Sequence, residues 1–218
     1  MSYHVADVPD GLSRMATTFL HIHAVRVERL PVEQYRARWL NQGIPAEVID
    51  RAAEFEVLWG GLVLPPAPCY AGGPRVLSVD STPEGSPEEG WRFGAGAQRC
   101  SVPFSFLIGP DGEFGIRVDR WTPLRASVEG WVESVALAHH ASLWARQITR
   151  LSGAAVENLD IGALELVPLV AGMADTWWRG PDSLVAVYRG EADSFGLPRL
   201  LQAHRYDGLP EHAFWFDR

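Results

Sequence analysis

The sequence predicts an α+β fold, in which helices pack against a mostly antiparallel, twisted sheet. Stretches with the apolar spacing of amphipathic helices alternate with short β-like stretches, and turns rich in Gly and Pro separate them. Hydrophobic residues make up 47% of the 218 residues, which is enough for a substantial core. The chain shows no internal repeat and no long linker, so we expect a single domain over residues 1–218.

The N-terminal third predicts one strand and two helices. Residues 17–30 alternate between apolar and polar side chains as a half-buried strand does, and residues 32–43 have helical spacing. A second helix opens at Pro45, where proline suits the first turn, and ends at Gly60 and Gly61. Its expected apolar stripe consists of Val48, Ile49, Ala52, Phe55 and Leu58.

The middle of the chain predicts short strands joined by turns. Residues 62–64 and 75–79 are expected strands. Residues 80–90 (DSTPEGSPEEG) are expected to form an exposed loop, because they are rich in Pro, Gly, Ser and acids. Residues 102–118 predict a β-hairpin, since two runs of alternating apolar residues flank the turn sequence Gly-Pro-Asp-Gly.

The last part of the chain predicts a long helix and then a β-rich extension over about 155–218. The helix is expected to start at its N-cap Ser127 and to end at Gly153. Its apolar stripe opens with Val128, Trp131, Val132 and Val135. The expected strands of the extension are 163–170, 183–190 and 200–208.

The charge of the chain favours a basic partner. The formal net charge is −8, and each of the 19 basic residues is an arginine. An acidic chain without a basic stripe is poorly suited to bind the phosphates of nucleic acid, so we expect no such contact. Cys69 and Cys100 lack metal-ligand spacing, and neither a secretory signal nor a membrane span is recognisable, which favours the cytoplasm.

No pattern indicates catalysis, so we expect a protein without enzymatic activity or cofactor. The chain has neither a Gly-x-Ser-x-Gly motif nor a lysine-containing phosphate loop. The alternative is a small metal-dependent enzyme. On a strand, His21 and His23 would share one face and could chelate a metal together with His139 or His140. Histidines packed at a sheet edge are the competing interpretation.

Two clusters are candidate partner-binding residues. One is the set of acids in the 80–90 loop, and the other combines Trp with Arg, which are residue types enriched in interface hot spots. The candidates are Glu84, Glu88, Glu89, Trp177, Trp178 and Arg179. Adjacent side chains of an extended segment point to opposite faces, so one tryptophan can lie in the core and the other on the surface. Alternatively, both tryptophans anchor the core around a turn.

A series of short motifs runs from the second helix to the long helix. A helical Phe precedes an aromatic-Gly-Gly turn and a strand, and a hairpin with an Asp-Gly turn leads to a helix that opens Ser-x-Glu. The residues are Phe55, Trp59, Gly60, Gly61, Asp111, Gly112, Ser127, Glu129, Trp131 and Val132. This order resembles the SUKH superfamily of bacterial immunity and regulatory proteins over about residues 32–150. The resemblance implies a left-handed cap at Gly60, a tight turn at Gly61, and Trp59 filling the joint between helix and sheet.

The resemblance also implies a function in binding. It suggests an intracellular immunity protein that neutralises a cognate toxin, commonly a nuclease or another cell-killing enzyme, by occluding its active site. An acidic, partly aromatic surface would dock on a basic toxin, and the loop acids would take the place of phosphates if the toxin is a nuclease. A regulatory protein-interaction scaffold without a toxin is a further alternative, which the product of the neighbouring gene would distinguish.

Overall fold

The computed structural model describes residues 2–5, 7–101, 104–189, 194–195 and 201–210. The α-helices are α1 (Arg14–His23), α2 (Arg36–Asn41), α3 (Ala46–Trp59), α4 (Val128–Trp144) and α5 (Ala154–Glu157). Short 3-10 helices are η1 (Val32–Tyr35), η2 (Tyr70–Gly72) and η3 (Pro168–Val170). The strands are β1 (Ser2–His4), β2 (Val25–Val27), β3 (Leu62–Val63), β4 (Glu84–Ser86), β5 (Gly90–Ala97), β6 (Ser105–Ile108), β7 (Phe114–Arg117), β8 (Trp121–Arg125), β9 (Gln147–Ser152), β10 (Glu165–Leu166), β11 (Asp175–Arg179), β12 (Ser183–Tyr188) and β13 (Gln202–Asp207).

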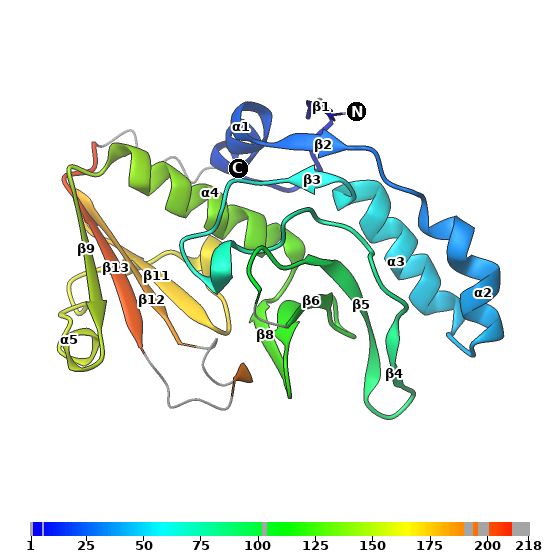
Figure 1. Cartoon of the computed structure of the whole chain (residues 1–218). Coiled ribbons are helices and arrows are strands. Elements are labelled where there is room, and N and C mark those ends of the chain that lie inside the picture. The colour runs from blue at the N-terminus through cyan, green and yellow to red at the C-terminus, as the bar shows by residue number, and fades with distance from the viewer. Residues whose placement is uncertain (1, 6, 102–103, 190–193, 196–200, 211–218) are drawn as a thin grey trace.

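The fold is α+β, as predicted, and the pairings of its described strands are antiparallel. These strands form three sheets rather than the one expected. Their orders are β1-β2-β3, β4-β5-β6-β7-β8 and β10-β11-β12-β13-β9. Figure 1 shows α4 running from the C-terminal sheet toward the middle sheet, with α1 and the small N-terminal sheet on its other side.

One hydrophobic core, with members from Val5 to Leu209, connects the three sheets. Helix α4 supplies much of it and is continuous through the two histidines at 139 and 140, with buried side chains on more than one face. It ends at Trp144 and not at Gly153, because residues 147–152 turn back as β9 and pair with β13. The C-terminal sheet therefore begins before residue 155. None of the helices in the described ranges has the length and apolar character that a membrane span requires.

The predicted strand over 17–30 is wrong in its first half, where the chain forms α1, and right at β2. Ser13 starts the helix: its Oγ accepts a hydrogen bond from the Ala16 N–H at 3.1 Å. The N–H and Oγ of Ser13 also donate to the carboxylate of Glu133 on α4, at 2.5 and 2.7 Å. A buried carboxylate at this end of α1 complements the positive end of the helix dipole. Glu133 lies 120 residues from Ser13, so no local pattern reveals the contact.

Helix α3 ends as expected at the two glycines, but their roles are the reverse of the prediction. Gly60 has φ −58°, and Gly61 has the left-handed φ of +78°. The Gly61 N–H donates to the Leu77 carbonyl at 2.9 Å, and its carbonyl accepts from the Val27 N–H at 2.8 Å. Trp59 is buried, consistent with a filled joint, whereas the predicted stripe residue Leu58 is exposed. Phe55 packs edge-on against Phe93 of β5, with ring centroids 5.7 Å apart.

Three predicted segments differ in detail. Residues 75–79 form no regular strand. The Arg75 N–H donates to the Ala97 carbonyl of β5, and the Leu77 N–H donates to the Leu62 carbonyl of β3. Residues 80–90 are not a plain loop, because β4 pairs with β5 in a hairpin. Of the predicted strand 163–170, only β10 is extended, and η3 follows it. The predicted strands at 183–190 and 200–208 correspond to β12 and β13, with residues 190 and 200 outside the described residues.

The two strongest local predictions are confirmed. The hairpin of 102–118 is β6 and β7 joined at 109–112, where Gly112 has φ +90°; residues 102–103 lie outside the described residues. The carbonyl of Glu113 accepts from the Gly109 N–H at 2.7 Å, which closes the turn beside Asp111. Ser127 caps α4, since its Oγ accepts from the Gly130 N–H at 3.3 Å.

Candidate functional site

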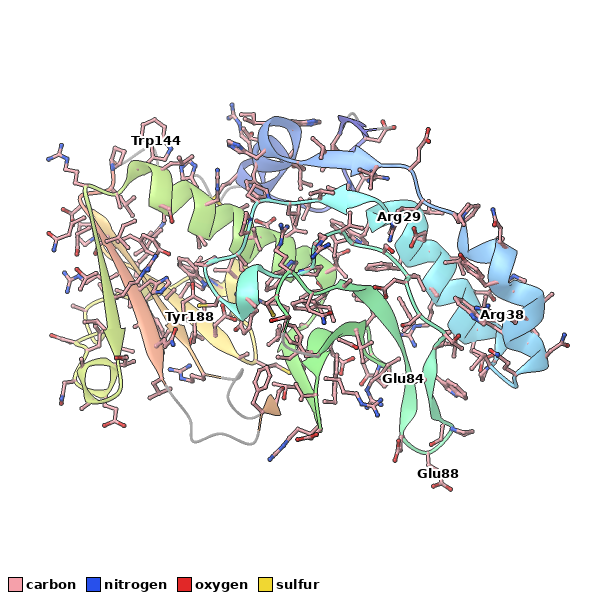
Figure 2. The ribbon with its side chains drawn as sticks, in the orientation of Figure 1. Arg29, Arg38, Glu84, Glu88, Trp144 and Tyr188 are labelled. Carbon is pink, nitrogen blue, oxygen red and sulfur yellow. The ribbon has the colours of Figure 1, made fainter. Side chains whose placement is uncertain are left out.

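The three candidate acids lie on the β4–β5 hairpin. Glu84 is on β4 and forms an ion pair with Arg117 of β7, while Glu88 and Glu89 are exposed in the turn. The turn is held by its own hydrogen bonds: the Glu89 N–H donates to Ser86 Oγ at 3.1 Å. Figure 2 shows Glu88 at the tip of the hairpin, which extends away from the body of the molecule. The acids are therefore presented on ordered backbone.

The candidate aromatic cluster lies on β11, where adjacent side chains point to opposite faces of the sheet. Trp177 is 1% exposed and stacks on Tyr206 with centroids 5.9 Å apart, so it belongs to the core. Trp178 is half-buried in a smaller apolar cluster on the other face and lies under the guanidinium of Arg189. Arg179 pairs with Glu165 at 2.7 Å. Figure 1 shows β11 and the β4–β5 hairpin well apart, so the candidate acids and tryptophans do not form one surface.

A cleft of about 630 Å³ opens beside the hairpin, between α2, the end of α3 and residues 78–82. Its volume lies in the range of small-molecule and side-chain binding sites. Charged and polar side chains dominate its wall. The lining residues are Glu28, Arg29, Leu30, Tyr35, Arg38, Trp39, Glu56, Ser78, Val79, Asp80, Ser81 and Thr82.

Two carboxylates of the cleft, those of Glu56 and Asp80, occupy space that a side chain on a neighbouring glycine would fill. Glu56 Oε2 accepts from the Val79 N–H at 2.8 Å, which ties α3 to the 78–82 segment. A Cβ on Gly60 would lie 2.7 Å from the Glu56 carboxyl group, so the glycine after Trp59 also makes room for this side chain. Likewise, a Cβ on Gly94 of β5 would lie 2.5 Å from Asp80 Oδ1.

The two carboxylates interact with each other and with Arg29. Burial raises the pKa of Glu56, and the neighbouring charge of Asp80 raises it further. Burial also raises the pKa of Asp80. The guanidinium of Arg29 acts in the opposite direction on both groups. Its Nη2 donates to Ser78 Oγ at 2.6 Å, which holds it in the cleft. Burial outweighs the effect of Arg29, so the pKa values of both carboxyl groups lie above their ordinary values.

The wall contributed by η1 and α2 carries one further cation and a buried donor. The guanidinium of Arg38 lies 5.3 Å from the centre of the Tyr35 ring. Trp39 is 2% exposed, and its indole N–H has no acceptor in the described part of the chain.

The histidines do not support the alternative metal site. On α1, His21 and His23 are separated by about 200° around the helix axis and share no face. His21 Nδ1 lies 3.0 Å from the Val5 carbonyl oxygen. The ring centroids of His23 and His139 are 4.4 Å apart. Burial lowers the pKa of His139, and His23 adds to the effect. Among the described residues, no three His, Cys, Asp or Glu side chains are placed to hold a metal, so the predicted His21–His23 chelate is wrong.

A buried ion pair joins the middle sheet to the C-terminal sheet. Arg125, the last residue of β8, donates to Asp175 at the start of β11 and to the Val170 carbonyl. Both side chains of the ion pair are almost fully buried. Because neither is open to a ligand, the pair is structural.

Sequence reasoning missed the residues of the cleft. Glu56 and Asp80 come from different parts of the chain, which the hydrogen bond from the Val79 N–H to Glu56 ties together. The sequence does hold one signal: Glu56 interrupts the apolar end of α3 three residues before Trp59-Gly60-Gly61. Comparison with protein-family models, with curated proteins and with solved structures finds no match to this chain.

Proposed function

We propose that this protein is an intracellular immunity protein that binds a cognate toxin and neutralises it by covering its active site. The observation that supports this most is the β4–β5 hairpin, which presents Glu88 and Glu89 to solvent. The net charge of −8 and the resemblance of residues 32–150 to the SUKH superfamily agree with it. The cytoplasm is the compartment in which such a protein acts.

The hairpin acids differ in how well they can serve a partner. Within the described residues Glu88 and Glu89 form no ion pair, whereas Glu84 is already paired with Arg117. A basic surface of the toxin would meet two uncompensated carboxylates at the tip and would compete with Arg117 for the third. Opposite charge across an interface accelerates association and fixes its orientation. In a nuclease, these carboxylates would occupy the place of the substrate phosphates.

The test is binding to the product of the neighbouring gene, measured by calorimetry at low and high salt. We expect tight binding that weakens as salt rises, because exposed charges are screened within about 10 Å at 0.1 M. The double variant Glu88→Gln with Glu89→Gln should weaken binding by about tenfold or more, which corresponds to roughly 1.4 kcal/mol.

The matched control is Glu157→Gln with Asp182→Asn. It removes the same charge from exposed residues of the C-terminal part, far along the fold from the hairpin. This variant should bind as the unchanged protein does. Equal losses in the two variants would mean that only net charge matters, and no binding by the unchanged protein would contradict the proposed function.

A further inference from the structure

A small cavity lies between α4 and the face of the C-terminal sheet that turns toward this helix (Figure 1). Its walls come from α4, including Val135 and Ala138, and from the strands β11 and β12. The space in it that is open to the centre of a water molecule is about 10 Å³. This is close to the smallest volume that holds one buried water.

Three polar side chains reach this cavity from one face of the sheet. Asp175 of β11 is paired directly with Tyr188 of β12, and Trp177 follows two residues later on β11. Side chains at such positions point to the same side of a sheet. All three line the cavity, and only 2% of Asp175, 1% of Trp177 and 8% of Tyr188 is exposed. Their polar atoms therefore gather in the interior, around one small space.

Each of these side chains carries a polar atom that needs a partner. Within the described part of the chain, Asp175 Oδ1, the Trp177 indole nitrogen and the Tyr188 hydroxyl form no hydrogen bond. The other oxygen of Asp175, Oδ2, accepts from Arg125. Buried polar atoms without a partner are costly and rare in folded proteins. Three of them around one cavity indicate a bound molecule that pairs with them.

The three groups act on one another although no direct hydrogen bond joins them. Burial raises the pKa of Asp175 to about 6, while the charge of Arg125 and then the nearby N–H of Trp177 act in the opposite direction. Burial also raises the pKa of the Tyr188 hydroxyl, and the charge of Asp175 adds to that effect. Polar groups that lie near each other but beyond bonding distance are commonly bridged by water.

The chemistry of the three groups selects water over an ion. An indole N–H only donates, an ionised carboxylate only accepts, and a phenol hydroxyl does either. Asp175 is ionised at neutral pH, since its pKa is about 6. The carboxylate would repel an anion, and the hydrogen of the indole N–H would repel a cation. A neutral molecule that donates and accepts at once suits both groups.

We propose that this cavity binds one water molecule, which donates to Asp175 Oδ1 and accepts from the Trp177 N–H and the Tyr188 O–H. The water links side chains of β11 and β12 and completes the bonding of the carboxylate that Arg125 holds on its other side. The cavity is too small for a larger ligand, so the ion pair of Arg125 with Asp175 keeps its structural role. The proposal goes beyond the proposed function and does not depend on it.

The first test is the transfer of magnetisation from water to the Trp177 indole N–H in isotope-labelled protein at neutral pH. The indole signal is assigned with Trp177→Phe. A water molecule that stays bound for longer than the protein takes to tumble gives cross peaks of opposite sign in NOE and ROE spectra, and we expect such a pair. No cross peak between water and this N–H would overturn the proposal.

The second test counts bound water by the magnetic relaxation of oxygen-17 in the solvent, which senses the oxygen of water and no hydroxyl of the protein. Ala138→Val enlarges a side chain in the cavity wall and should displace the water. The amplitude of the relaxation dispersion should then fall by the contribution of one molecule. Ala136→Val is the matched control, because Ala136 is also buried on α4 but does not line this cavity. The control should leave the amplitude unchanged.

The amide spectrum of each variant shows whether it folds. If Ala138→Val does not fold, Val135→Ile enlarges the same wall by a smaller step. An unchanged amplitude in a folded variant of this wall would refute the water site, and any cross peak at Trp177 would then come from a hydroxyl hydrogen. An equal fall in amplitude in the Ala136→Val control would refute the site as well.

Discussion

The Trp59-Gly60-Gly61 turn allows a quantitative prediction for Gly61→Ala. Gly61 has φ +78°, and an added Cβ would lie 2.0 Å from the Val27 carbonyl oxygen of β2. The residue thus requires glycine for two separate reasons, the left-handed backbone and the contact with a neighbouring strand. Gly112 in the β6–β7 turn has φ +90° with nothing within 4 Å of the added Cβ, so Gly112→Ala carries the first cost alone.

The magnitude follows from these contacts. A non-glycine residue in the left-handed region costs roughly 1–2 kcal/mol, which is the whole expected effect of Gly112→Ala. In Gly61→Ala the strands must also separate, which weakens the bonds from the Val27 N–H and to the Leu77 carbonyl at about 1 kcal/mol each. We therefore expect a total of about 3–4 kcal/mol. At about 2–4 °C per kcal/mol for a chain of this size, Tm should fall by roughly 6–16 °C.

The assay is urea unfolding followed by tryptophan fluorescence, for which the chain has nine tryptophans. The urea concentration at the unfolding midpoint should fall in both variants, with an unchanged slope of unfolding free energy against urea concentration. The loss of unfolding free energy should be at least about 1 kcal/mol larger in Gly61→Ala than in Gly112→Ala. Binding of the partner at low temperature should persist in both variants, because neither glycine lies at the hairpin tip. Equal destabilisation by the two substitutions would refute the role assigned to the contact between Gly61 and Val27.

The remaining predictions concern the buried ion pair. Arg125→Ala removes the partner of Asp175 and a donor to the Val170 carbonyl, so it should cost about 3–5 kcal/mol of unfolding free energy. Glu165→Gln breaks an exposed ion pair with Arg179 and should cost under about 1 kcal/mol. Similar losses for the two variants in thermal unfolding would contradict this. Burial raises the pKa of Asp175 to about 6 from an ordinary 3.8, against the effect of Arg125. The folded state therefore binds this proton more tightly than the unfolded state, and stability from this group is lost as pH rises from about 4 through about 6. Asp175→Asn should remove that part of the pH dependence of the unfolding free energy. If plots of unfolding free energy against pH are parallel for the variant and the unchanged protein, Asp175 does not titrate in this way.

Local signals predicted the elements that depend on local chemistry. The apolar spacing of α3, the Gly-Pro-Asp-Gly turn and the Ser127 cap each act within a few residues, and the structure confirms all three. Helix α1 was mistaken for a strand because its spacing is ambiguous over ten residues. Its start depends on the contact between Ser13 and Glu133, which lie 120 residues apart.

Of the candidate site, the sequence predicted only the part that depends on local chemistry. The acids of the hairpin are visible in the sequence because they are close together, but β4 has no apolar alternation and is held by pairing with β5 and by the ion pair of Glu84 with Arg117. The cleft depends on tertiary contacts: the bond between Val79 and Glu56, and the space that Gly94 leaves for Asp80. Sequence spacing carries no record of either contact.

The most direct test of the proposed function is titration of the neighbouring gene product, assayed for its own toxic activity, with this protein. Neutralisation by a tightly bound partner predicts that activity falls linearly and reaches its minimum at a one-to-one ratio. It also predicts that the Glu88→Gln, Glu89→Gln variant needs a clear excess to reach the same minimum. Full toxin activity in the presence of a tenfold excess of the unchanged protein would contradict the immunity function.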